Sequence, residues 1–227
     1  MIAAIHQPNY LPWSGYFHKM VKADVFVFLD NVQFTKNSYQ NRAKIKGLRG
    51  EQWLTVPVKT SGSFGEMTNR IKVDNSQNWR EKHLRTIRQN YSKAEFFGNY
   101  SGMVEKMYGE ETELLAEMNE KIIVGLSKAL GIETKFVRAS ELGAGGESTD
   151  LLIGICRKVG ADTYLSGKGG KKYMDEGKFE EAGIGLEYTD FTQPRYRQRY
   201  GDFVENLSAI DLLFNEGENA RKLLGGQ

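Results

Sequence analysis

Side chains that can handle protons or bind polar groups gather near the start of the chain, in His6-Gln7-Pro8-Asn9-Tyr10. This segment follows a short apolar run, and Asp30 follows a second one. An imidazole or a carboxylate in such a place can accept a proton from a substrate. We predict His6 and Asp30 as catalytic residues, with substrate bound by Gln7, Asn9, Tyr10 and Trp13. A structural alternative, in which His6 bonds a neighbouring loop and Asp30 caps a turn, stays open.

A second segment combines glycines with lysines and reads Ser166-Gly167-Lys168-Gly169-Gly170-Lys171-Lys172. Glycine lets backbone N–H groups approach an anion closely, and lysine supplies the charge that holds phosphate or carboxylate. The spacing matches neither a Walker A loop nor the G-x-G-x-x-G fingerprint, so no particular nucleotide is indicated. We predict phosphate binding by Ser166, Gly167, Lys168, Gly169 and Gly170, and a flexible turn with solvated lysines is the alternative.

A third segment is both basic and aromatic and reads Gln193-Pro194-Arg195-Tyr196-Arg197-Gln198-Arg199-Tyr200. Such a segment can stack on a base or clamp phosphates, and it can equally be a solvated loop over an aromatic core. We predict substrate binding by Arg195 and Tyr196. The basic stretch at residues 36–49 is more typical of a solvated face.

Short apolar runs with the pattern of buried strands recur along the chain, at residues 2–5, 25–29, 133–138, 161–165 and 184–188. Two more strands are predicted at 53–58 and 70–73. Apolar residues at helical spacing predict helices at 13–21, 79–91, 112–130, 148–159, 171–182 and 207–214, with Ser148 or Thr149 capping the fourth of them.

Strands and helices alternate at both ends of the chain, and a strand–helix–strand crossover favours parallel pairing. The sequence therefore predicts an α/β fold with an open, mostly parallel Rossmann-like sheet. We expect one domain over residues 1–227, with a helical and basic insertion at about 35–130. Ligands of such sheets bind beyond the carboxyl ends of the strands, so one ligand should touch both residues 6–13 and residues 166–172.

Composition excludes several classes of protein. Lys and Arg number 31 against 29 Asp and Glu, a net charge of +2, which argues against a general binder of double-stranded nucleic acid or of membranes. No apolar run is long enough to insert into a membrane. The single cysteine, Cys156, excludes an intrachain disulfide, and the three scattered histidines favour no metal site. We expect a protein of the reducing cytoplasm.

Longer motifs extend over nearly the whole chain. They are residues 5–13 with 15–17, residues 30–34, Asn41-Arg42, and residues 53–58, 164–167 and 207–215. Together they resemble the WbqC-like protein family, which is tied to gene clusters for O-antigen and related surface sugars, and one member of which has been proposed as a glycine transferase. On this resemblance we add Gln33, Asn41 and Arg42 to the predicted substrate-binding residues.

The opening strand, His-containing loop and helix are also similar to the start of pantothenate synthetases and other HIGH-type nucleotidyl-transfer enzymes. Those enzymes bind ATP at this place and activate a carboxylate. Asn9 stands where the HIGH motif has its second histidine, and no K-M-S-K-S is present. This similarity makes ATP with magnesium a candidate cofactor.

The leading hypothesis is an enzyme that joins glycine, or a similar small amino acid, through an amide bond to an amino sugar carried on a nucleotide. His6 or Asp30 would deprotonate the amine, and Lys168 would stabilise phosphate charge. The donor would be free glycine with ATP, or glycyl-tRNA. The alternative is a non-catalytic sugar-nucleotide-binding or scaffold protein of the same pathway.

Overall fold

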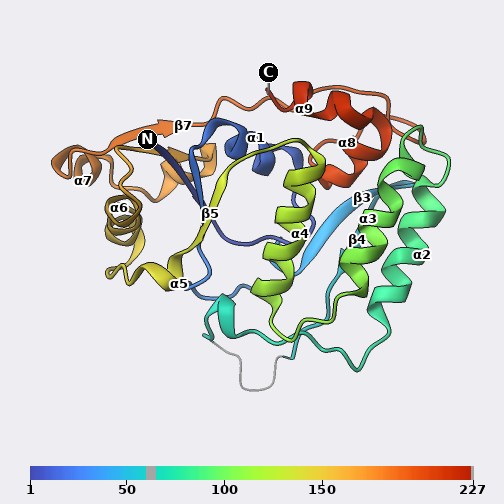
Figure 1. The fold of residues 1–227 in the computed structure, drawn as a ribbon, viewed down its shortest axis with the longest axis horizontal. Helices are drawn as coiled ribbons and strands as arrows, with labels where there is room; N and C mark the ends of the chain where they lie inside the picture. The colour runs from blue at the N-terminus through green and yellow to red at the C-terminus, as the bar shows by residue number, and fades with distance from the viewer. Residues whose placement is uncertain (60–64, 226–227) are drawn as a thin grey trace.

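The computed structural model describes residues 1–59 and 65–225. Its main sheet has five strands, all parallel, in the order β5-β2-β1-β6-β7 (Figure 1). Their bounds are β1 Ile2–His6, β2 Val25–Phe28, β5 Lys135–Arg138, β6 Thr163–Ser166 and β7 Gly185–Tyr188. The chain moves outward on one side of β1 and then returns to its other side, so the direction of winding reverses between β1 and β6. This confirms the predicted Rossmann-like sheet.

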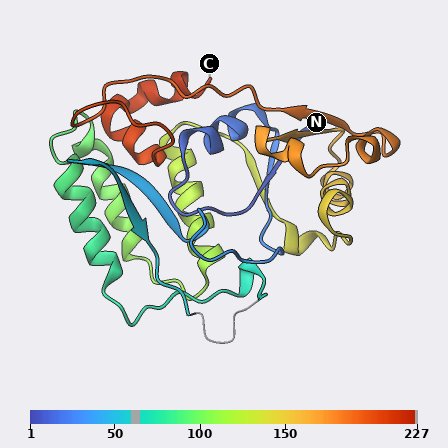
Figure 2. The ribbon, with the colours of Figure 1, turned by 180° about the vertical axis from the view of Figure 1, so that it is seen from behind.

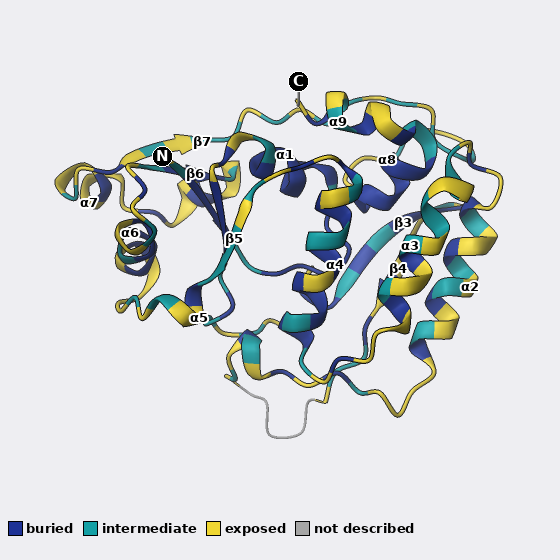
Figure 3. Ribbon diagram, viewed as in Figure 1, coloured by how far each residue is buried: buried dark blue, intermediate teal, exposed yellow. Residues whose placement is uncertain are grey.

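Alternate residues of the central strands enter two separate cores. Ala4 and Phe26 pack into the larger core, while Ala3 and Val25 pack into the smaller one. Side chains of a strand point to opposite faces in turn, so a run that is apolar throughout is buried on both sides. This is why β2 is buried along its whole length (Figure 3).

Helices cover both faces of the sheet. The larger core receives α1 (Ser14–Lys22), α4 (Leu115–Ala129), α8 (Ala209–Glu216) and α9 (Ala220–Leu223). The smaller core receives α5 (Ala139–Leu142), α6 (Ser148–Val159) and α7 (Glu176–Glu181). The helix α1 carries the chain from β1 to the parallel neighbour β2, as predicted.

Between β2 and β5 the chain leaves the sheet. This part contains the antiparallel hairpin β3 (Arg42–Gly47) and β4 (Gly50–Thr55), the helices α2 (Trp79–Tyr91) and α3 (Phe97–Gly109), and then α4. The hairpin contacts α2 and α8 through β3 (Figure 2). The division into one domain with an insertion at about 35–130 stays a prediction.

Three local predictions were wrong. Residues 70–73 form no strand, because Thr68–Arg70 is a 3-10 turn (η1) and Lys72 and Val73 make only isolated bridges. Residues 171–182 are not one helix, because the 3-10 turn η2 (Lys168–Lys172) ends first and the Asp175 side chain caps α7. The fourth helix is not capped by Ser148 or Thr149, since Glu147 holds that position and Thr149 Oγ1 accepts a hydrogen bond from the Asp175 N–H.

No helix within residues 1–59 and 65–225 combines the length and apolarity needed to cross a membrane.

Candidate functional site

A cavity of about 360 Å³ opens at the carboxyl ends of β1 and β6, where the winding reverses. We call it the switch-point cavity. Its walls come from β1, the first turns of α1, the turn at residues 166–172 and the segment after β7. The structure thus brings His6 and Trp13 onto one cavity with the Gly-Lys turn (residues 166–172), which lies 160 positions later in the sequence. Ligands of open α/β sheets bind at this place.

His6 lines the switch-point cavity as a neutral imidazole. Its Nδ1 lies 3.0 Å from the Gln7 carbonyl oxygen, and because a carbonyl only accepts, Nδ1 carries the proton. The ring packs edge-on against Tyr16, with centroids 4.6 Å apart. Burial, helped by the positive charge of Lys19, lowers the pKa of His6 to about 3. Nε2 is therefore left with a lone pair that can accept a proton or a hydrogen bond.

Lys19 lines the same cavity and was missed by the sequence analysis. It is 4% exposed, and within the described part of the chain it makes no ion pair or hydrogen bond. Burial lowers its pKa to about 7. An ammonium taken out of water without a partner is costly, and a bound anion would relieve that cost. Its spacing of three from Tyr16, on the buried side of α1, was the signal that could have found it.

The glycines of the Gly-Lys turn differ in what the fold requires. A Cβ on Gly170 would lie 2.4 Å from both Ser166 Oγ and Met174 Cε, so packing explains this glycine. At Gly167 and Gly169 a Cβ would meet nothing within 4 Å, and neither residue has a positive φ. Both line the cavity. Internal packing therefore gives no reason for these two glycines, whereas close approach of a ligand does.

Aromatic rings form the outer wall of the switch-point cavity. Trp13 and Phe191 meet edge to face with ring centroids 5.6 Å apart. A Cβ on Gly15 would lie 2.4 Å from the Trp13 ring and 2.9 Å from Phe191, so the glycine lets both rings close over α1. Lys168 is exposed and donates to the Phe191 carbonyl oxygen at 3.3 Å. Phe191 follows the last strand, where nothing in the sequence pattern singled it out.

Asp30 lies outside the switch-point cavity. Its carboxylate accepts from the Ser140 N–H at 2.9 Å and from the Ser140 hydroxyl at 2.6 Å. It lines a separate cavity of about 210 Å³ at the ends of β2 and β5. The structure therefore does not place Asp30 beside His6 in one cavity, because the hydrogen bonds to Ser140 tie its side chain toward α5.

The two tyrosines predicted to bind substrate form hydrogen bonds with other side chains of the protein. Tyr10 is buried and its hydroxyl bonds His83 and Tyr108. The Tyr196 hydroxyl donates to Asp211 at 2.8 Å. Both side chains belong to the larger core, so neither lines the switch-point cavity.

The remaining predicted residues also lie away from this cavity. Asn41 is buried and donates to the Val56 carbonyl oxygen, and Arg42 stacks over Trp53 at 4.3 Å from the ring centroid. Asn9 is buried and Gln33 exposed. Arg195 lies over the Phe203 ring, 5.3 Å from its centroid. The Gln7 carbonyl oxygen accepts from His6 and Tyr16.

In residues 1–59 and 65–225, no group of three or more His, Cys, Asp or Glu side chains is placed to bind a metal ion.

Residues 7–223 match the WbqC-like protein family, so the match includes α1 and the Gly-Lys turn. The chain belongs to this family. This WbqC-like protein is 34% identical over 219 residues to "Uncharacterized protein Rv1507c" of Mycobacterium tuberculosis (strain ATCC 25618 / H37Rv). That alignment covers 96% of this chain and 94% of the relative. No solved structure matches. Membership of the WbqC-like family suggests a role in polysaccharide biosynthesis.

Proposed function

We propose that this WbqC-like protein joins glycine, or a similarly small amino acid, to the amino group of a nucleotide-linked amino sugar in surface-polysaccharide synthesis. The observation that carries the proposal is the switch-point cavity, where a neutral imidazole, a buried lysine and the Gly-Lys turn line one space. Such a set suits a substrate that has both a phosphate and an amine.

The phosphate of the substrate binds between Lys19 and the Gly-Lys turn. Lys19 supplies a buried positive charge that lacks a partner among the described residues, and Lys168 supplies a second charge at the rim. Gly167 and Gly169 leave the backbone open to the ligand. The first turn of α1 adds N–H groups of a helix N-terminus, which favour an anion.

His6 acts on the proton of the amine. The sugar nitrogen attacks the carbonyl carbon of glycine, a C–N bond forms, the bond to the leaving oxygen breaks, and Nε2 takes the proton that nitrogen loses. A bound phosphate would neutralise the Lys19 charge, which is one cause of the low pKa of His6, and so make the imidazole a stronger base. When free glycine is the donor, ATP with magnesium would supply the activation of its carboxyl group.

A second candidate function is non-catalytic binding of a sugar nucleotide. The observation that favours it is the pKa of His6, about 3, which makes the imidazole a weak base in the free protein. A binding protein needs the lysines and the open glycines and needs no proton acceptor.

One assay separates the two functions. The protein is incubated with labelled glycine and a panel of nucleotide-linked amino sugars, once with ATP and magnesium and once with glycyl-tRNA. Transfer of label to a sugar with either donor supports the transferase. Calorimetric binding of a sugar nucleotide without transfer from either donor supports the binding protein, and absence of both binding and transfer contradicts both functions.

A further inference from the structure

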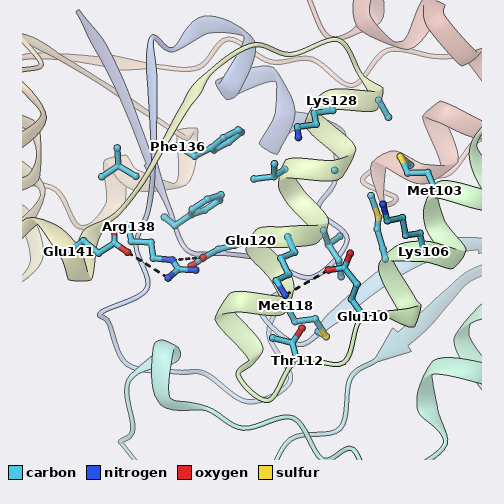
Figure 4. Close-up of a pocket in the computed structure, with 18 residues that line it drawn as sticks. Met103, Lys106, Glu110, Thr112, Met118, Glu120, Lys128, Phe136, Arg138 and Glu141 are labelled. Carbon is cyan, nitrogen blue, oxygen red and sulfur yellow. Dashed lines mark hydrogen bonds and ion pairs between the residues drawn. The ribbon is translucent and has the colours of Figure 1, made fainter.

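A second and larger cavity, of about 840 Å³, lies between α3, α4 and β5 (Figure 4). We call it the Glu120 cavity. Its apolar wall includes Phe28 and Phe136, whose rings stack nearly parallel with centroids 5.4 Å apart, and Met118. It shares no residue with the switch-point cavity. The wall has the apolar and aromatic character of small-molecule sites.

At one end of this cavity Glu120 leaves a carboxylate oxygen without a partner. The residue is 5% exposed, and its Oε2 accepts from Arg138 Nε at 2.6 Å (Figure 4). Oε1 has no hydrogen-bond partner among the described residues. Glu120 and Arg138 also line the smaller cavity that contains Asp30, so they stand where the two spaces adjoin. A buried carboxylate oxygen without a donor is costly.

Several carboxylates lie near Glu120 and Arg138. Arg138 also pairs with Glu141 of α5, at 3.6 Å. Burial, with a smaller contribution from the charges of Asp30 and Glu117, raises the pKa of Glu120 to about 7 against the opposing effect of Arg138. The Arg138 guanidinium is thus shared between Glu120 and Glu141, while Arg70, which lines the adjoining smaller cavity, pairs with Glu66 at 3.7 Å.

The other charged groups of the Glu120 cavity lie at its rim. Lys121 pairs with Glu110 at 3.7 Å. Lys106 and Lys128 lie on α3 and at the far end of α4, away from Arg138 in Figure 4. Among the described residues, none of these lysines donates to Glu120 Oε1.

We propose that the Glu120 cavity binds a small organic molecule with a protonated primary amine on an apolar body. The ammonium donates to Glu120 Oε1, and the body packs against Phe28, Phe136 and Met118. An anion at Oε1 would be repelled by the Glu120 carboxylate, and a purely apolar molecule would leave Oε1 unpartnered. Because this cavity uses no residue of the switch-point cavity, the inference stands apart from the proposed function.

Benzylamine is the probe, and benzyl alcohol is its neutral counterpart of similar shape. Titration calorimetry at pH 8 is expected to show binding of benzylamine at least about tenfold tighter than that of benzyl alcohol, because only the ammonium forms a hydrogen bond to Glu120 in which both partners are charged. Glu120→Gln should abolish this preference. Glu105→Gln, a matched loss of one carboxylate on α3 outside the cavity, should retain it.

The pH dependence is a second readout on the unmodified chain. Glu120 gains charge as pH rises through about 7, so benzylamine should bind more tightly at pH 8 than at pH 6, and the bound amine should shift the Glu120 pKa downward in carboxyl-detected NMR. Equal affinity for benzylamine and benzyl alcohol, or an unshifted Glu120 pKa in the presence of saturating benzylamine, would overturn the inference even if Glu120→Gln fails to fold. Binding of neither probe at millimolar concentration would overturn it too.

Discussion

The switch-point cavity and the Glu120 cavity both adjoin strands of one parallel sheet, yet the buried charged side chain in each has the opposite sign. The first has a buried lysine without an acidic partner among the described residues, beside glycines open to solvent. The second has a buried glutamate with an oxygen that lacks a donor among the same residues. The comparison teaches that the sheet fixes where the two cavities lie, while residues on the flanking helices, Lys19 of α1 and Glu120 of α4, set the sign of the buried charge in each.

The largest expected effect is a loss of turnover on substitution of His6, in contrast to a loss of stability on substitution of Asp30. His6→Ala should lower turnover of glycine transfer by roughly 10² to 10⁴ with little change in thermal stability or in affinity for the sugar nucleotide, because it removes the proton acceptor. Asp30→Asn should instead reduce stability by about 1–3 kcal/mol, because it weakens the hydrogen bonds to Ser140, and leave turnover nearly intact. Turnover and denaturant unfolding of both variants check this. An equal loss of stability in both would assign His6 a structural role.

The next effect concerns the two lysines of the switch-point cavity. Lys19→Met and Lys168→Ala should each weaken calorimetric binding of a phosphorylated ligand by about tenfold to a hundredfold, as expected for loss of a charge-assisted contact. Lys22→Met, at the end of the same helix and outside the cavity, is the matched control. Unchanged affinity in both variants would mean that the Gly-Lys turn is a solvated loop.

Two glycines of the same turn sharpen the distinction between packing and binding. Gly170→Ala should destabilise the fold by about 1–3 kcal/mol, because its Cβ meets Ser166 and Met174. Gly169→Ala should retain stability and weaken phosphate binding only. Chemical unfolding and calorimetry measure the two quantities. A similar loss of stability in both variants would contradict the assignment of an open backbone at Gly169.

A further expected effect is the pH dependence caused by Lys19. Its pKa of about 7 in the folded protein lies below the ordinary lysine value of about 10.4, so the unfolded chain binds more protons between these values. Stability should therefore rise with pH through this interval from this group alone, and the penalty should be complete below about pH 7. Lys19→Met should flatten that part of the stability profile in denaturant titrations. An identical profile in both proteins would show that the ammonium is already satisfied.

Sequence patterns predicted the sheet and the meeting of its loops because both follow from local rules. Buried parallel strands appear as continuous apolar runs, and strand ends fix where the following loops meet. Polar side chains were harder to place. Tyr10 and Tyr196 stand beside site residues in the sequence, but each enters the larger core and donates or accepts there.

Lys19 and Glu120 were missed for a related reason. Each stands within a helix whose apolar spacing predicts only packing, and the spacing does not tell which residues surround the charge. Those neighbours come from parts of the chain distant in sequence, such as Arg138, which pairs with Glu120. Phe191 was missed because it comes from a segment without regular structure, whose path depends on Trp13 and His18.

The division of the apolar interior by the central strands has a consequence for cooperativity. The switch-point cavity takes Tyr16 from the larger core and Tyr164 from the smaller one, and β1 contributes side chains to both. Neither core can unfold without separating β1 from its neighbouring strands β2 and β6. Heating should therefore unfold both cores in a single calorimetric transition. Because a ligand in the switch-point cavity contacts residues of both cores, the midpoint of that transition should rise with ligand concentration.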